Sequence, residues 1–164
     1  MSLASGPSSA DFDPLDVPVR DAATVMLVRD GLAGLEVFMM RRTLDAVFAG
    51  GLYVFPGGAV DDADRHGDVQ SVCAGRSDAG ASAVLAVPAG GLAYWVAAIR
   101  ECFEEAGVLL AVDSDGEVVR FDDLPVEERF TAHRRAVHDG ELRLVDLCRD
   151  EDLRLDLGVI QWLT

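Results

Sequence analysis

The 164-residue sequence contains no lysine, and arginine supplies all 14 of its basic side chains. Aspartate and glutamate number 29, so the formal net charge at pH 7 is −15. A surface this acidic repels nucleic acid, and the sequence shows no basic patch that would bind it. A phosphorylated ligand meets the same repulsion, so a site for one requires metal ions or local arginines.

Cysteine and long apolar runs are also scarce. The sequence has three cysteines, Cys73, Cys102 and Cys148, and no C-x-x-C pair. An odd number of cysteines without such a pair argues against a disulfide framework and against a zinc site. Free thiols are typical of a reducing compartment, so we expect a cytoplasmic protein. The best apolar run, 81–87, ends at Pro88, well short of the roughly 18 residues of a membrane span. We therefore expect no membrane partner.

The composition that remains is that of a globular domain. Hydrophobic residues make up 50% of the chain and the mean hydropathy is +0.20. Residues 1–20 mix Ser, Pro, Gly and Asp and are predicted to form a flexible segment. Residues 21–164 are predicted to form one domain. Within it, the Ala-, Gly- and Ser-rich stretch 65–90 is predicted to be an insertion loop, with one short helix near 81–87.

Two stretches of the sequence are predicted to be halves of one site. The first is 55–58 (FPGG), which is followed by an acidic run at 61–64. Pro56 ends the strand before it, and the glycines allow a turn that can aim a backbone carbonyl at a metal ion. The second stretch is 100–108, with the sequence RECFEEAGV.

In a helix, the carboxylates of the second stretch share one face. Glu101, Glu104 and Glu105 stand at positions i, i+3 and i+4, where like charges repel each other. A divalent cation such as Mg²⁺ removes this conflict because it takes oxygen ligands. Arg100 is placed to hold Glu104, four residues later, and Gly107 is suited to end the helix. A solvated acidic surface is the alternative interpretation.

Together the two stretches resemble the Nudix box of the Nudix hydrolases, G-x5-E-x7-R-E-U-x-E-E-x-G-U. Gly58 matches the opening glycine, and 100–108 match the whole second half. Asp64 stands where the family has a longer glutamate, so we expect water to mediate its contact with the helix. The family has seven residues between this acid and the arginine, whereas 65–99 fill the gap here. The extra residues are predicted to loop out and to leave Gly58 close to the helix glutamates.

The residues ahead of the box resemble the pattern R-[SA]-x3-R-x3-G-x3-F-P-G-G of Nudix coenzyme A diphosphatases. Arg42, Gly51 and 55–58 match this pattern at the same spacing, while Thr43 and Val47 replace its second residue and its second arginine. With its long insertion, the sequence is most similar to the subfamily with a split Nudix box that includes the peroxisomal coenzyme A diphosphatase.

The resemblance implies a metal-dependent hydrolase that cleaves the diphosphate bond of a nucleoside diphosphate linked to another moiety. Coenzyme A or an acyl-coenzyme A is the candidate substrate, and Mg²⁺ or Mn²⁺ is the implied cofactor. ADP-ribose or a dinucleotide such as NADH is the alternative substrate. A non-catalytic Nudix-like nucleotide-binding module is the alternative class of protein.

The resemblance also implies roles for the residues that match its motifs. The implied catalytic residues are Arg100, Glu101, Glu104 and Glu105. The implied metal ligands are the carbonyl of Gly58 and the carboxylates of Glu101, Glu104 and Glu105. The implied substrate-binding residues are Arg41, Arg42 and Gly57. Structural roles within the box fall to Asp64 and Gly107. Which glutamate serves as the general base stays open.

The implied fold is an α/β/α sandwich of the Nudix type, with helices on both faces of a mixed sheet. The sequence predicts strands at 22–29, 35–42, 51–55, 108–112, 118–121 and 157–163. It predicts helices at 92–106, 125–138 and 142–148. Since the last strand would leave an unpaired edge or an uncovered apolar face, we expect further strands that this sequence does not contain, or a partner copy in a homodimer that supplies them.

Some residues near these motifs have two interpretations. Trp95, just before the box, is predicted to pack in the core rather than to stack on a base. His66 and Asp68 are predicted to be exposed loop residues rather than metal ligands. His133 and His138 would lie about 140° apart around a helix, so they are not expected to form a metal-binding pair.

Overall fold

The computed structural model describes residues 18–43 and 51–163. The strands are β1 (Ala22–Thr24), β2 (Val28–Gly31), β3 (Gly34–Val37), β4 (Met40–Arg41), β5 (Tyr53–Val54), β6 (Gly57–Ala59), β7 (Cys73–Ala74), β8 (Ala111–Val112) and β9 (Arg154–Asp156). The helices are η2 (Val69–Val72), α1 (Asp78–Leu85), α2 (Leu92–Glu101), η3 (Cys102–Ala106), α3 (Leu124–His138), α4 (Leu144–Asp150) and η4 (Leu157–Val159). Of these, η2 and η4 are 3₁₀-helices and η3 is a π-helix. Within the described ranges, no helix has the length and the apolar character needed to cross a membrane.

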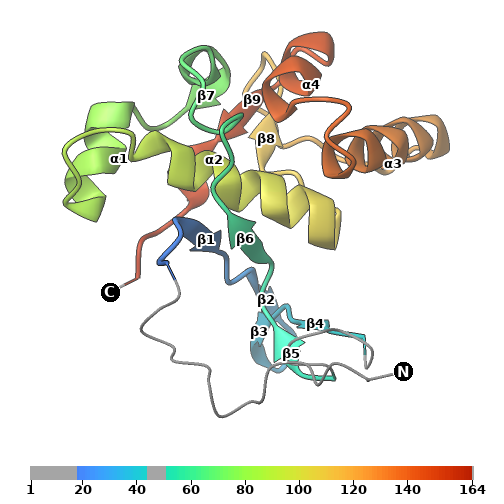
Figure 1. Ribbon diagram of the computed structural model, residues 1–164. Helices are drawn as coiled ribbons and strands as arrows, with labels where there is room; N and C mark the ends of the chain where they lie inside the picture. The colour runs from blue at the N-terminus through green and yellow to red at the C-terminus, as the bar shows by residue number, and fades with distance from the viewer. Residues whose placement is uncertain (1–17, 44–50, 164) are drawn as a thin grey trace, which may run out of the picture.

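Helix α2 lies at the centre of the fold, with β1 and β6 on one side and the sheet of β7, β9 and β8 on the other (Figure 1). Most of its residues are buried, as expected for a helix that is apolar nearly all round. Val96 and Ile99 belong to the larger core, together with Leu155 of β9. Ala98 belongs to a smaller cluster with Val25, next to β1. The box helix is therefore held from two sides.

The pairing of β1 with β6 places the FPGG turn beside α2. The two strands are antiparallel, with Thr24 opposite Gly57, and the N–H of Val25 donates to the carbonyl of Pro56 at 2.9 Å. A Cβ atom on Gly57 would collide with the backbone of β1, so only glycine permits this close approach. The strand pair thus fixes where the Gly-Gly backbone lies relative to the helix.

The sheet of β7, β9 and β8 closes the other side of the core. Strand β9 is central, and it runs parallel to β7 and antiparallel to β8. Its residue Leu155 is opposite Cys73 on one side and Ala111 on the other, and all three side chains are buried. This small sheet is mixed, as predicted, although it has only three strands.

The larger sheet arrangement differs from the prediction. Among the described residues, the strands form four separate sheets, β1–β6, β2–β3, β4–β5 and β7–β9–β8, instead of one mixed sheet between helices. The strand predicted at 22–29 is broken after Thr24, because Pro56, opposite Val25, has no N–H with which to return the hydrogen bond it accepts. The predicted hairpin is present as β2 and β3, with Val28 opposite Val37.

Residues 65–90 contain more regular structure than the one short helix predicted within the insertion loop. They include η2, β7 and α1, and α1 begins at Asp78, ahead of the predicted range 81–87. Its start is capped by Ser77, whose Oγ accepts a hydrogen bond from the N–H of Gly80 at 3.2 Å. The same stretch contributes Val69 and Val72 to the larger core, so it is packed into the domain.

The prediction of a last strand at 157–163 is wrong. Strand β9 ends at Asp156, whose carboxylate accepts a hydrogen bond from the N–H of Gly158 at 3.1 Å and starts η4. Beyond η4, Ile160 packs against both cores, while the side chain of Trp162 is 54% exposed. That further strands or a partner copy complete the sandwich stays a prediction.

Candidate active site

The helix that carries the box glutamates has the predicted extent. Helix α2 continues without a break into the π-helix η3, so the regular stretch covers 92–106. Gly107 ends it with a left-handed backbone (φ 71°), which a residue without Cβ adopts at little cost. Glu101 is the last residue of α2, and Glu104 and Glu105 lie in the π-turn.

The two stretches predicted to be halves of one site meet in space. The N–H of Gly57 donates to Oε2 of Glu105 at 2.9 Å, across 48 positions of sequence. A Cβ atom on Gly58 would collide with the carboxylate of Glu101. The residues between the two stretches therefore lead out and return, as predicted, and leave the Gly-Gly backbone against the helix glutamates.

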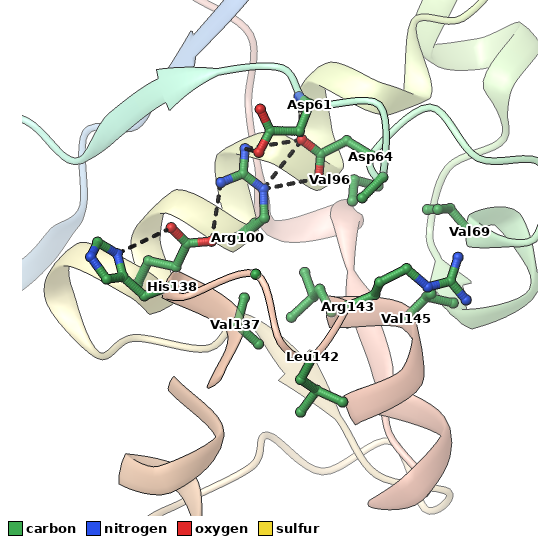
Figure 2. A pocket seen from close by; sticks show the side chains of 14 residues that line it. Asp61, Asp64, Val69, Val96, Arg100, Val137, His138, Leu142, Arg143 and Val145 are labelled. Atoms are coloured by element: carbon green, nitrogen blue, oxygen red, sulfur yellow. Dashed lines mark hydrogen bonds and ion pairs between the residues drawn. The ribbon is translucent and has the colours of Figure 1, made fainter. Parts of the chain in front are cut away.

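Arg100 is a buried hub for the acidic side chains around it (Figure 2). Its Nε and Nη2 atoms both donate to Asp64, at 3.0 Å to Oδ1 and 3.0 Å to Oδ2. Its Nη1 donates to Glu101 at 2.9 Å and to Glu104 at 3.1 Å. Nη2 also donates to the carbonyl of Ala59 in β6, at 2.8 Å. The water-mediated contact expected for Asp64 is thus replaced by a direct, two-pronged ion pair.

The charges of this cluster are not balanced. Burial would lower the pKa of Arg100, but hydrogen bonds and charge from Asp64 and the helix glutamates raise it above its usual value. Burial raises the pKa of Glu101, the charge of Arg100 opposes this rise, and the charges of Glu104 and Glu105 add to it. One guanidinium forms ion pairs with four carboxylates, those of Asp61, Asp64, Glu101 and Glu104. The excess of negative charge suits a bound cation.

The glutamates are turned toward protein partners. In the described part of the chain, no three His, Cys, Asp or Glu side chains are gathered closely enough to hold a metal ion. The hydrogen bonds give the reason, since Glu101 and Glu104 face Arg100 while Glu105 faces the N–H of Gly57. Each of these bonds uses one oxygen of its carboxylate, so a cation bound by these glutamates would require their other oxygens to turn toward a common point. The donor set still fits a hard divalent cation, because it consists of carboxylate oxygens and nearby backbone carbonyls.

A cavity of about 170 Å³ lies beside Glu104, and no sequence motif predicts it. Figure 2 shows Asp61, Asp64, Arg100 and His138 along one part of it and, along the rest, apolar side chains with Arg143 among them. His138, at the end of α3, lines it with Nδ1 3.7 Å from Oε2 of Glu104. Asp61 also lines it and lies 3.5 Å from Nη2 of Arg100. The acidic run at 61–64 was the only sequence signal for Asp61. No sequence pattern predicts that α3, and with it His138, lies beside the box.

The arginines predicted to bind substrate are not joined to the glutamates. Arg41 lies in β4 opposite Tyr53, and the backbone of Arg42 pairs with Leu52 and Gly51. Both side chains are exposed, and among the described residues no hydrogen bond or ion pair links them to the box. Figure 1 shows β4 and β5 apart from α2. Of the predicted substrate-binding residues, the structure places Gly57 at the site. Val47 lies outside the described residues.

The remaining candidates have structural surroundings. Trp95 is buried in the larger core, as predicted, with the guanidinium of Arg76 over its ring at 4.7 Å. His66 and Asp68 contact each other, and Asp68 also pairs with Arg143, just before α4, and with Arg149 of α4, so it is not an isolated loop residue. His133 pairs with a glutamate and not with His138. Burial raises the pKa of Cys102, between the glutamates, to about 12, so its thiol is not a nucleophile.

Comparison with known proteins supports the Nudix-type fold that the sequence implies. No family model matches the sequence. The crystal structure of a NUDIX hydrolase from Alicyclobacillus acidocaldarius is similar to this chain, with 28% sequence identity and a TM-score of 0.63. The chain therefore has a Nudix-like fold. The match covers 88% of this chain and 60% of that hydrolase, so the chain spans less than two thirds of its neighbour's length.

Proposed function

We propose that the chain is a metal-dependent Nudix hydrolase that cleaves the diphosphate bond of a nucleoside diphosphate linked to another moiety. The observation that carries this proposal is the contact of 57–58 with Glu101 and Glu105, which assembles the two halves of the box. The similar NUDIX hydrolase supports the reaction class. Acidic surface alone would not explain why a buried arginine binds three carboxylates at this point.

The glutamates and the Gly58 carbonyl would hold Mg²⁺ or Mn²⁺. The chemistry that such a cation supplies when bound is neutralisation of phosphate charge and a lower pKa of the attacking water. Water attacks one phosphorus of the diphosphate, a new P–O bond forms, and the bond to the bridging oxygen breaks. One of Glu101, Glu104 and Glu105 accepts the proton of that water. Arg100 orients the carboxylates and does not touch the substrate.

Coenzyme A or an acyl-coenzyme A is the substrate we propose first, on the strength of Arg42, Gly51 and the FPGG turn. ADP-ribose or a dinucleotide such as NADH is the second candidate. In either case Gly57 would approach the diphosphate beside Glu105, and Arg41 and Arg42 would bind a more distant part of the molecule. The free, buried cysteines are in keeping with a cytoplasmic location, which also stays a proposal.

A nucleotide-binding module without catalysis is the alternative class. It would share the fold and the cluster around Arg100, and its glutamates would bind a ligand without activating water. The retained set of Glu101, Glu104 and Glu105 favours the enzyme, because three like charges on one helix face are otherwise unfavourable.

A substrate panel separates these possibilities. The protein is incubated with Mg²⁺ or Mn²⁺ and coenzyme A, ADP-ribose or NADH, and the products are separated by chromatography. Cleavage within the diphosphate yields two phosphomonoesters, and chelation of the metal should abolish it. Turnover of coenzyme A supports the first substrate, and turnover of the others alone supports the second. Binding of these compounds without any turnover would contradict the enzyme and favour the binding module.

A further inference from the structure

The end of the box helix depends on donors from outside the helix. In its last turn, the N–H of Gly107 donates to the carbonyl of Phe103 at 3.0 Å, and the N–H of Val108 donates to that of Cys102 at 3.3 Å. The next two carbonyls belong to Glu104 and Glu105, and in the described part of the chain no backbone N–H beyond the helix donates to them. Helix carbonyls in such positions need partners from side chains or water.

Arg134 of α3 provides those partners. Its Nε donates to the carbonyl of Glu104 at 2.8 Å, and its Nη2 donates to the carbonyl of Glu105 at 2.9 Å. The guanidinium is partly buried, and a Cβ atom on Gly107 would lie 3.2 Å from its Nη1. The glycine thus contributes both its left-handed backbone and the space in which the arginine lies.

We propose that Arg134 is a positioning residue for Glu104 and Glu105, an inference that rests on the proposed function of these glutamates. Two bonds from one planar group fix consecutive peptide units, and these units bear the carboxylates. The π-turn makes this support more important, because its wider turn is a rare geometry that recurs at functional sites. A cation at the C-terminal end of a helix is also favoured by the helix dipole.

The test compares Arg134→Ala and Arg134→Lys with Arg135→Ala in the full chain. Arg135 is the exposed neighbour on the same helix, so its replacement removes the same charge and leaves the cap. The first readout is amide hydrogen exchange of a peptide spanning 104–109, which requires neither metal nor substrate. We expect exchange about tenfold faster in Arg134→Ala, the effect of losing a bond from a charged donor. Arg134→Lys should recover part of the protection, and Arg135→Ala should match the wild type.

The second readout is the affinity for Mn²⁺, measured by the loss of the free-ion signal in electron paramagnetic resonance. Removal of a residue that orients metal ligands typically weakens metal affinity at least tenfold, and we expect this for Arg134→Ala. Unchanged exchange and unchanged affinity would overturn the inference. So would an equal loss of protection throughout α2 and the β7–β9–β8 sheet, because Arg134 would then support the whole fold.

The failure of the proposed function would look different. A wild-type protein that binds no Mn²⁺ and hydrolyses none of the panel compounds would refute the function, whatever Arg134 does. If local exchange alone responded to Arg134→Ala while Mn²⁺ affinity did not, the function would stand and the positioning role would be overturned.

Discussion

At the scale of single residues, the site is governed by competition for Arg100. This guanidinium is 9% exposed and donates to Asp64, Glu101 and Glu104. Its single positive charge therefore neutralises each of the three carboxylates only in part. Asp64 is itself buried and accepts hydrogen bonds from both Nε and Nη2 of Arg100. Removing either partner of such a buried ion pair is costly, because the other charge is then left buried without a partner. Glu104 retains a second oxygen, Oε2, on the side of the cavity and His138.

Glu104→Gln should abolish most activity and leave the fold intact. The change keeps the shape of a proposed metal ligand and removes its charge, so we expect kcat to fall roughly a hundredfold or more. The free energy of unfolding of the metal-free protein should change by at most about 1 kcal/mol, because relief of repulsion offsets a weaker bond to Arg100. Kinetics on the substrate that the panel identifies, together with urea unfolding, measure both effects.

Glu128→Gln is the matched control for that change. Glu128 is exposed in α3 and loses the same charge, so its replacement should leave turnover unaltered. Near wild-type turnover in Glu104→Gln would refute its assignment as a metal ligand.

At the scale of elements, a side-chain clasp joins the segment before η2 to α4. Asp68 accepts hydrogen bonds from Arg143 at 3.0 Å and from Arg149 at 3.2 Å, and Asp146 of α4 pairs with the same two arginines. The clasp holds the residues that separate the two halves of the box against the rest of the domain.

Asp68→Asn should destabilise the protein at neutral pH and lose its effect in acid. The hydrogen bond from Arg143 holds the pKa of Asp68 at about 2, below its value of 3.8 in the absence of partners. A lowered carboxyl pKa stabilises the fold above pH 3.8, and this contribution disappears as the pH falls toward 2. The difference in melting temperature between wild type and variant should therefore shrink between about pH 6 and about pH 2.

The control for the clasp is Asp62→Asn, which removes one exposed aspartate near the same segment. It should lower the melting temperature less than Asp68→Asn at neutral pH. A difference between Asp68→Asn and wild type that stays constant across this pH range would contradict the clasp.

The elements most accurately predicted from sequence are those with strong local signals. The helix at 92–106 has an apolar face, three spaced glutamates and a terminal glycine, and α3 begins with Pro125 near its first turn, as predicted. The strands were overestimated, because apolar runs such as 22–29 and 157–163 show that a segment is apolar and do not show whether it pairs. The turn at Asp156 and Gly158 is a local feature that hydrophobicity conceals.

The candidate site was predictable only where its residues lie in the box. Spacing indicated Glu101, Glu104 and Glu105, and the resemblance indicated that Gly58 lies near them. Helix α3 contributes His138 and Arg134 to the site, and their positions depend on how this helix packs against η3. No local sequence pattern encodes a contact between elements so far apart in sequence.

At the scale of the whole molecule, the net charge of −15 works against compactness. The 29 acidic residues outnumber the 14 arginines, and several arginines are already engaged in ion pairs. The repulsion that remains is spread over the surface and is screened by salt over about 10 Å at 0.1 M.

Monovalent salt should therefore raise the melting temperature. We expect an increase between about 0.02 and about 0.2 M NaCl in a chelator-treated sample, because screening weakens the repulsion more than it weakens the scattered surface ion pairs. A melting temperature that falls over this range would show that the ion pairs outweigh the repulsion.

The central claim is that the box glutamates form one cation site, and Mn²⁺ binding to the metal-free protein tests it most directly. Electron paramagnetic resonance reports the free ion, whose signal should fall as wild-type protein is added. The account predicts binding at least tenfold weaker in Glu104→Gln and unchanged in Glu128→Gln. Wild-type protein that leaves the Mn²⁺ signal unaltered, or equal binding by Glu104→Gln, would contradict it.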